Sequence, residues 1–269
     1  MSESVEGDRV EELWGVLDEL LVIWDGRPVQ TSVGRGSRVT PARLAVVLAF
    51  ASHTHRLARA VVHLHEAGME LEAMPLVRGV LEHGLTAQWM VNNEEALAGF
   101  VNEQQRQRRN TGQVMLRLGW GDTDEVAAII AKSVMVPSTG DGPARVFQQL
   151  CEDFDPLGSE LYAAYRVLSS LTHPGNHIVD SYLDLGSDDS NAITIRVAPH
   201  EPLATVTWLW TLCAGCMWAS RAADMLDRNR PYRQPLRRIA KALRVPGTPD
   251  LHERTWLRRQ GGTRKGKSS

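Results

Sequence analysis

A stretch of nineteen residues without a charge, PLATVTWLWTLCAGCMWAS at 202–220, constrains the fold more than any other feature of the sequence. Its length is enough for a helix that crosses a membrane. However, its three threonines, one glycine and three tryptophans are spread through the segment, whereas the tryptophans of membrane helices gather at the two ends. We therefore predict no membrane contact, and a helix buried in the middle of a helical bundle.

The remaining segments supply the other members of such a bundle. Apolar residues recur at intervals of three and four in residues 8–24, 40–66 and 72–92, which is typical of amphipathic helices. Further helices are expected at about 121–134, 144–151 and 234–243. The predicted fold class is all-α, an antiparallel helical bundle.

One segment departs from the helical pattern. Ile193, Ile195 and Val197 alternate with polar residues, which predicts a strand. Residues 179–185 are the expected partner strand, so one small β-hairpin at about 178–197 is appended to the bundle.

The distribution of charge divides the chain at about residue 227. Residues 1–227 hold 17 Lys and Arg against 30 Asp and Glu, a balance of −13, whereas residues 228–269 hold 13 against 2, a balance of +11. We predict a single helical-bundle domain at 1–227 and a basic, partly disordered extension at 228–269. Two interpretations of the extension stay open: it binds nucleic acid through phosphate charge, or it folds back on the acidic body and keeps the protein soluble.

Cysteine usage and the N-terminal residues indicate a cytoplasmic protein. The first residues carry acids where a secretory signal peptide carries basic side chains. The three cysteines form no disulfide framework, and Cys213 and Cys216 are a lone CxxC pair within the uncharged segment. We interpret them as core residues.

Four histidines in residues 40–66 raise the question of a metal site. Only His55 lies on the apolar line of that helix, and His53, His63 and His65 point in other directions. They cannot converge on one ion without ligands from elsewhere. We therefore expect a hydrogen-bonded, partly buried His55, and neither a metal nor another cofactor.

The segment YAAYRVLSSLTHPGNH at 162–177 is the candidate functional site. At 100° per residue, one helix face carries polar side chains and the opposite face carries leucines. The polar face consists of Tyr162, Arg166, Ser169, Ser170 and His173. Pro174 and Gly175 then stop the helix beside His173.

A second polar pair lies on an apolar stripe of the helix at 72–92. Arg78 and Glu82 are four residues apart, so one turn of helix brings them together. Burying two charges is costly unless they are paired. The pair either fixes the register of the helix as a buried ion pair or supports the site at Arg166 and His173.

The spacing Arg166-x6-His173 resembles the R-x4–6-H signature of the HEPN superfamily of helical bundles, which includes bacterial toxins, defence proteins and RNA-processing enzymes. Residues 40–225 are also similar to a bacterial family of uncharacterised helical proteins, a domain of unknown function. This second resemblance rests on Arg78-x3-Glu82 and on Tyr165-Arg166-x2-Ser169-x3-His173.

The HEPN resemblance implies a metal-independent endoribonuclease that works as a homodimer. In it, His173 would move a proton and Arg166 would stabilise charge on the phosphate of RNA. His177 follows in the same loop and would orient His173 or the substrate. The alternative is a non-catalytic helical module that binds a protein or nucleic acid, with Arg166 bonded to Glu82 and Ser169 capping backbone carbonyls. A pocket that exposes both Arg166 and His173 favours the enzyme, and an Arg166 enclosed by carboxylates favours the module.

Overall fold

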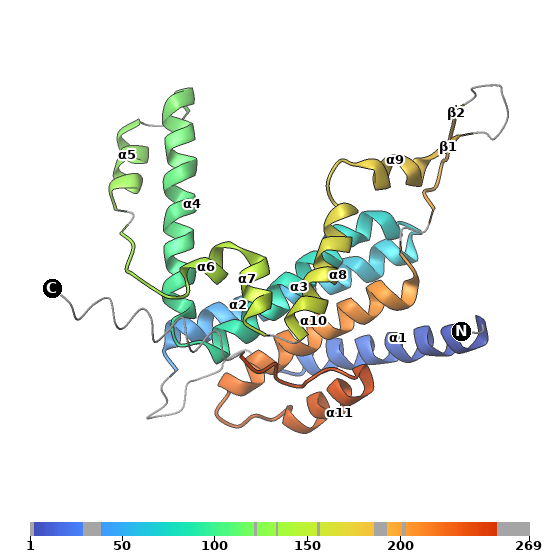
Figure 1. The fold of residues 1–269 in the computed structure, drawn as a ribbon. Helices are drawn as coiled ribbons and strands as arrows, with labels where there is room; N and C mark the ends of the chain where they lie inside the picture. The colour runs from blue at the N-terminus through green and yellow to red at the C-terminus, as the bar shows by residue number, and fades with distance from the viewer. Residues whose placement is uncertain are drawn as a thin grey trace. The chain divides into compact units, whose positions relative to one another are not determined.

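The computed structural model describes residues 3–28, 39–120, 123–132, 134–154, 157–185, 193–200 and 203–251. These residues form helices and one small hairpin, which confirms the predicted all-α class (Figure 1). The helices are α1 (Glu3–Asp25), α2 (Pro41–Glu66), α3 (Glu70–Asn92), α4 (Ala96–Leu118), α5 (Thr123–Ala131), α6 (Asp141–Arg145), α7 (Phe147–Glu152), α8 (Leu157–Ser170), α9 (Asn176–Tyr182), α10 (Thr205–Leu226) and α11 (Arg233–Leu243).

The chain divides into two compact units. The first unit comprises Met1–Gln88 and Glu160–Pro249, and the second comprises Trp89–Ser159 with Asp250–Ser269. The organisation as a single domain at 1–227 stays a prediction. The candidate site lies wholly in the first unit.

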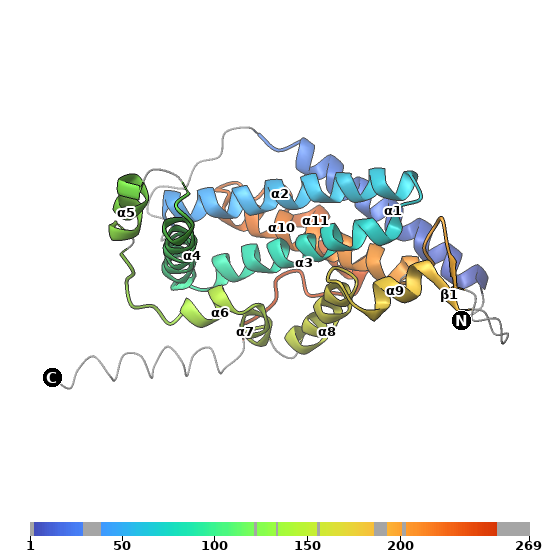
Figure 2. The same ribbon diagram turned by 90° about the horizontal axis from the view of Figure 1, so that it is seen from above.

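Helix α10 is the centre of the first unit, as the uncharged segment predicted. Seventeen of its 22 residues are buried, the largest share of any described helix, and α1, α2 and α11 pack against it. Figure 2 shows α2, α3 and α10 running side by side. Cys213 and Cys216 are fully buried in this core, and burial raises the pKa of both thiols. No helix in the described part of the chain is long and apolar enough to span a membrane.

Helices α3 and α10 approach closely through a pair of glycines. A Cβ atom on Gly84 would lie 2.4 Å from the carbonyl oxygen of Gly215, closer than real Cβ contacts allow. One turn further along, the Gln88 side-chain amide donates to the Trp218 carbonyl oxygen at 2.8 Å. Together these contacts fix the register of α3, the helix that carries Arg78 and Glu82, against the core.

His55 is enclosed between α1, α2 and α10. It is 1% exposed, and its ring stacks on Trp24 at 4.3 Å between centroids. Its Nδ1 lies 2.7 Å from the Ala51 carbonyl oxygen, and its Nε2 lies 2.9 Å from the Ser220 hydroxyl. A carbonyl only accepts, so Nδ1 carries the proton and Nε2 accepts from Ser220. Burial lowers the pKa of His55 to about 4, so the ring is neutral at pH 7.

The second unit is built on the long helix α4. Helices α5 and α6 both pack against α4 (Figure 1). Here too a glycine pair permits close approach, because a Cβ on Gly99 would lie 2.5 Å from the Gly140 carbonyl. The Trp89 indole donates to Asp153 at 2.9 Å, which ties the end of α3 within this unit to the segment after α7.

The hairpin is present but shorter than predicted. Strand β1 (Leu183–Leu185) pairs antiparallel with β2 (Ile193–Ile195), with Leu183 opposite Ile195. Residues 179–182, part of the segment 179–185 that we predicted as strand, are helical and belong to α9. Inside α9 the Ser181 hydroxyl donates to the His177 carbonyl at 2.7 Å, a bond across one helical turn. The predicted turn between the strands lies outside the described residues.

The start of the basic extension forms the helix predicted at 234–243. Helix α11 buries Leu236, Ile239, Ala240 and Leu243, which share one face at helical spacing. The remainder, from residue 252 onward, lies outside the described residues, so disorder there stays a prediction.

Candidate functional site

A pocket of about 460 Å³ opens at the C-terminal end of α8. All five residues of the predicted polar face line it, together with the loop that follows the helix. Its lining consists of Tyr162, Tyr165, Arg166, Ser169, Ser170, His173, Pro174, Gly175 and His177. The structure therefore gathers the predicted residues of 162–177 around one space.

The pocket is shaped by an early end of the helix. We predicted helix as far as His173, but α8 ends at Ser170. The residue before a proline is disfavoured in helical conformation, so Pro174 unwinds the chain ahead of itself. The Thr172 hydroxyl donates to the Leu168 carbonyl at 2.8 Å, and the His173 amide donates to the Ser169 carbonyl at 3.2 Å. These two bonds hold His173 at the pocket although it lies beyond the helix.

Arg166 and His173 are both exposed to solvent in this pocket. No hydrogen bond or ion pair within the described part of the chain joins Arg166 to Glu82, so the arrangement considered for the binding module, with Arg166 bonded to Glu82, is not seen there. Arg166 lies on the outer side of α8, and its neighbour Tyr165 faces α3 instead. The arrangement is the one that we took to favour an enzyme.

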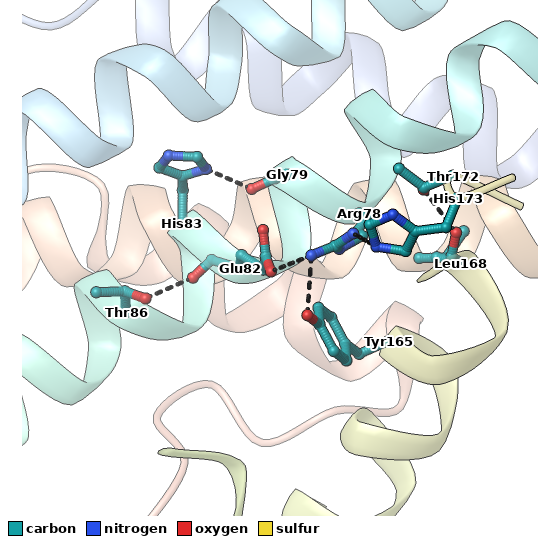
Figure 3. Close-up of polar contacts among 9 residues, drawn as sticks. All are labelled: Arg78, Gly79, Glu82, His83, Thr86, Tyr165, Leu168, Thr172 and His173. Atoms are coloured by element: carbon teal, nitrogen blue, oxygen red, sulfur yellow. Dashed lines mark hydrogen bonds and ion pairs between the residues drawn. The ribbon is translucent and has the colours of Figure 1, made fainter. Parts of the chain in front are cut away.

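The arginine that occupies the centre of the polar cluster is Arg78 of α3 (Figure 3). Its guanidinium donates to Glu82 Oε1 at 3.2 Å and to the Tyr165 hydroxyl at 2.9 Å, and it lies 4.7 Å from the Tyr165 ring centroid. Its Nη1 is 3.3 Å from Nε2 of His173. The Arg78 and Glu82 side chains are 18% and 31% exposed, so the pair is only partly buried. Arg78 thus links Glu82 on α3 to Tyr165 and His173 across the two helices.

The contact with Arg78 determines which ring nitrogen of His173 carries the proton. A guanidinium has donors only, so Nε2 of His173 must accept. In this arrangement the proton of the neutral ring is on Nδ1, assigned from the hydrogen-bond pattern. The Nε2 lone pair of His173 is therefore directed at the Arg78 guanidinium.

The two serines of the polar face, Ser169 and Ser170, make different contacts. The Ser170 hydroxyl donates to the Val167 carbonyl at 2.7 Å, so it is Ser170 that satisfies a backbone carbonyl. The Ser169 hydroxyl, to which the binding-module alternative gave that role, is buried and has no hydrogen-bond partner among the described residues. Tyr162 stacks on Tyr165 with 5.9 Å between ring centroids, which gives the pocket an aromatic wall.

One supporting contact had no signal in the sequence. The Tyr182 hydroxyl donates to Glu72 Oε1 at 2.6 Å, and this bond raises the pKa of Tyr182. It attaches the end of α9 to α3, and α9 follows directly on the loop with Pro174 and Gly175. The two residues are 110 positions apart, and neither belongs to a recognisable motif.

Acidic, histidine and cysteine side chains are not gathered for metal binding anywhere in the described residues: no group of three or more is placed to hold an ion.

Comparison with known proteins gives one match. Residues 44–192 match the model of a family described as a family of unknown function (DUF5677). No curated protein and no solved structure matches the chain. The matched residues include Arg78, Glu82, Tyr165, Arg166 and His173.

Proposed function

The chain belongs to the DUF5677 family, whose function is unknown, and we propose that it is a metal-independent endoribonuclease with His173 and Arg166 as its catalytic residues. The observation that carries this proposal is the open pocket in which both side chains are exposed. An RNA phosphodiester needs access to an acid–base group and to a cation at once, and this pocket offers both.

The chemistry requires one proton to move and one phosphate charge to be stabilised. The 2′-hydroxyl of RNA would take the place of Arg78 as the donor to Nε2 of His173 and lose its proton there. The 2′-oxygen then attacks the adjacent phosphorus and the bond to the 5′-oxygen breaks. The leaving 5′-oxygen takes up the proton that Nε2 of His173 had accepted, which restores the neutral ring. The products are a 2′,3′-cyclic phosphate and a free 5′-hydroxyl.

The remaining pocket residues have supporting roles in this proposal. Arg166 stabilises the negative charge that develops on the phosphate oxygens. His177 is the second titratable group of the pocket and orients the substrate or the leaving oxygen. The aromatic wall of Tyr162 and Tyr165 offers a stacking surface for a base. By the HEPN resemblance, the active form is a homodimer of toxin or defence type.

A second candidate function is a non-catalytic module that binds RNA or a protein. One observation favours it: Arg78 already occupies Nε2 of His173, the atom that the reaction needs. In this case the pocket recognises its partner through Arg166 and the tyrosines without breaking a bond.

The test is incubation of purified protein with RNA in EDTA, comparing wild type with His173→Ala and Arg166→Ala. His63→Ala and Arg117→Ala are matched controls, because both residues are exposed and lie outside the pocket. General acid–base catalysis by one residue is worth about 10²–10⁴-fold, so His173→Ala should lose nearly all cleavage and the controls none.

Fluorescence anisotropy with a labelled RNA separates the two candidates. RNA binding without cleavage, in both monomeric and dimeric wild type, would replace the enzyme with the binding module. Cleavage that persists in both pocket variants would show that a contaminating nuclease cuts the RNA.

A further inference from the structure

A second pocket, of about 340 Å³, lies where α10, α11 and the segment after α11 meet. Its polar lining comes from Arg221 of α10, Arg237 and Lys241 of α11, and Thr248, and its apolar lining includes Ala240 and Val245. It shares no residue with the pocket at His173. Three of its lining side chains are therefore cationic, and none is acidic.

Arg221 is the buried cation of this pocket. Its side chain is 9% exposed and its Nη1 donates to Asp224 at 2.9 Å. Its Nε is buried and has no hydrogen-bond partner in the described part of the chain. A buried donor without a partner is costly, which indicates an interaction that a bound group would complete.

Arg237 and Lys241 add two exposed charges to the same pocket. They lie four residues apart on α11, so they project from one face of the helix, where like charges repel. The ion pairs formed within the described residues include none for either side chain. The three cations of the pocket and the neighbouring carboxylate of Asp224 together carry a net charge of +2.

The crowding of positive charge is also visible at Arg221 itself. Burial lowers the pKa of its guanidinium, Asp224 opposes this, and the charges of Arg230 and Arg237 lower it further. An anion placed between Arg221, Arg237 and Lys241 would relieve this repulsion.

We infer that this pocket binds a phosphate group. Arginine offers two parallel N–H donors that match phosphate oxygens, and lysine offers a concentrated charge. The volume lies at the lower end of the range of small-molecule sites, about 300–1,000 Å³. Ala240 and Val245 provide apolar surface for the organic part of a phosphate ester. Free phosphate and a phosphate ester share this chemistry, and the experiment distinguishes them.

The experiment is calorimetric titration of the full chain with inorganic phosphate and, separately, with adenosine 5′-monophosphate. The variant is Arg237→Gln with Lys241→Gln, since both side chains are exposed and circular dichroism should show an unchanged fold. The control is Arg228→Gln with Arg233→Gln, which removes the same charge from exposed positions outside the pocket.

We expect one phosphate per chain, with affinity weakened about tenfold or more by the pocket variant and less than about twofold by the control. Tighter binding of the nucleotide identifies an ester as the ligand, and equal or weaker binding identifies free phosphate. The proposal is overturned if neither probe binds wild type, or if both double variants weaken binding equally, since that would show only general charge attraction.

Discussion

His55 and His173 lie in the same unit and have opposite surroundings. The His55 ring is 1% exposed, has a bond at each nitrogen and stacks on Trp24. The His173 ring is exposed and lines a pocket, and among the described residues its ring has one hydrogen bond, from the Arg78 guanidinium. A histidine with every donor and acceptor satisfied inside a core can only stabilise the fold, whereas one at an open pocket can exchange a proton with a ligand.

The difference between the two histidines can be tested by two kinds of measurement. Changes at His55 should alter stability, and changes at His173 should alter chemistry with the fold intact. Four predictions test this division, beginning with the largest expected effect.

The largest effect is expected from His55→Ala. The substitution leaves a cavity beneath Trp24 and removes the acceptor of the buried Ser220 hydroxyl, so the free energy of unfolding should fall by about 3–5 kcal/mol. His173→Ala should change it by less than about 0.5 kcal/mol, because His173 is exposed. Urea unfolding of both variants gives the comparison. Equal losses would show that the two rings do not differ in structural role.

The next effect is the dependence of stability on pH. The pKa of His55 is about 4 in the folded protein against 6.5 for an unburied histidine. Between these values the unfolded state binds the proton and the folded state does not, so the free energy of unfolding decreases as pH falls. The slope from this group is about 1.4 kcal/mol per pH unit, roughly 3 kcal/mol in all.

Urea unfolding at several pH values from 7 to 4 measures this slope. His55→Gln removes the titrating group, so its slope over that range should be smaller than that of wild type. His173→Gln is the control and should keep the wild-type slope. A slope unaffected by His55→Gln would place the pH dependence in other groups.

A smaller effect is expected from Glu82→Ala at the polar cluster. Removing one partner of a fully buried ion pair costs about 3–5 kcal/mol. Glu82 is 31% exposed and Arg78 keeps Tyr165 and His173 as partners, so the loss should be only about 1 kcal/mol. Glu11→Ala, at an exposed position of α1, is the reference. A loss as large as that of His55→Ala would mean that the cluster belongs to the core.

The smallest effect is expected from Tyr165→Phe. It removes one partly buried hydrogen bond to Arg78 and leaves the ring beneath the guanidinium, so the loss of stability should be about 0.5–1 kcal/mol. Thermal unfolding monitored by circular dichroism is sensitive enough when wild type is measured in parallel. An increase in melting temperature would show that the bond strains the cluster.

Periodicity and charge predicted most of the helices because each depends on residues close together in the chain. The absence of charge in 202–220 predicted the buried helix α10, and the apolar line of the second helix predicted the burial of His55. The helix face shared by Arg166 and His173 predicted that the two side chains lie together, and both line one pocket. In each case the side chains of a helix repeat about every 3.6 residues, so the position of a residue in the sequence determines the direction in which its side chain points.

The errors concern contacts between segments and the ends of elements. The binding-module alternative paired Arg166 with Glu82, whereas the helix rotation places Tyr165 and His173 against Arg78. Rotating the helix by one residue would exchange such neighbours, and no sequence pattern determines that rotation. We interpreted residues 179–185 as the strand that pairs with the alternating segment at 193–197, but residues 179–182 belong to the helix that begins after Gly175. The contact between Tyr182 and Glu72 on α3 joins residues 110 positions apart, and no sequence pattern predicts it.

The glycine contact between α3 and α10 reverses an ordinary rule of protein engineering. Replacing a helical glycine with alanine usually stabilises a helix by about 1 kcal/mol. At Gly84 the added methyl would meet the backbone of Gly215, which has no side chain to turn aside. The helix that carries Arg78 would have to move away from the core, and its guanidinium would move with it. A screen for more stable variants would therefore select against alanine at this position, and would preserve the geometry at His173 without ever assaying it.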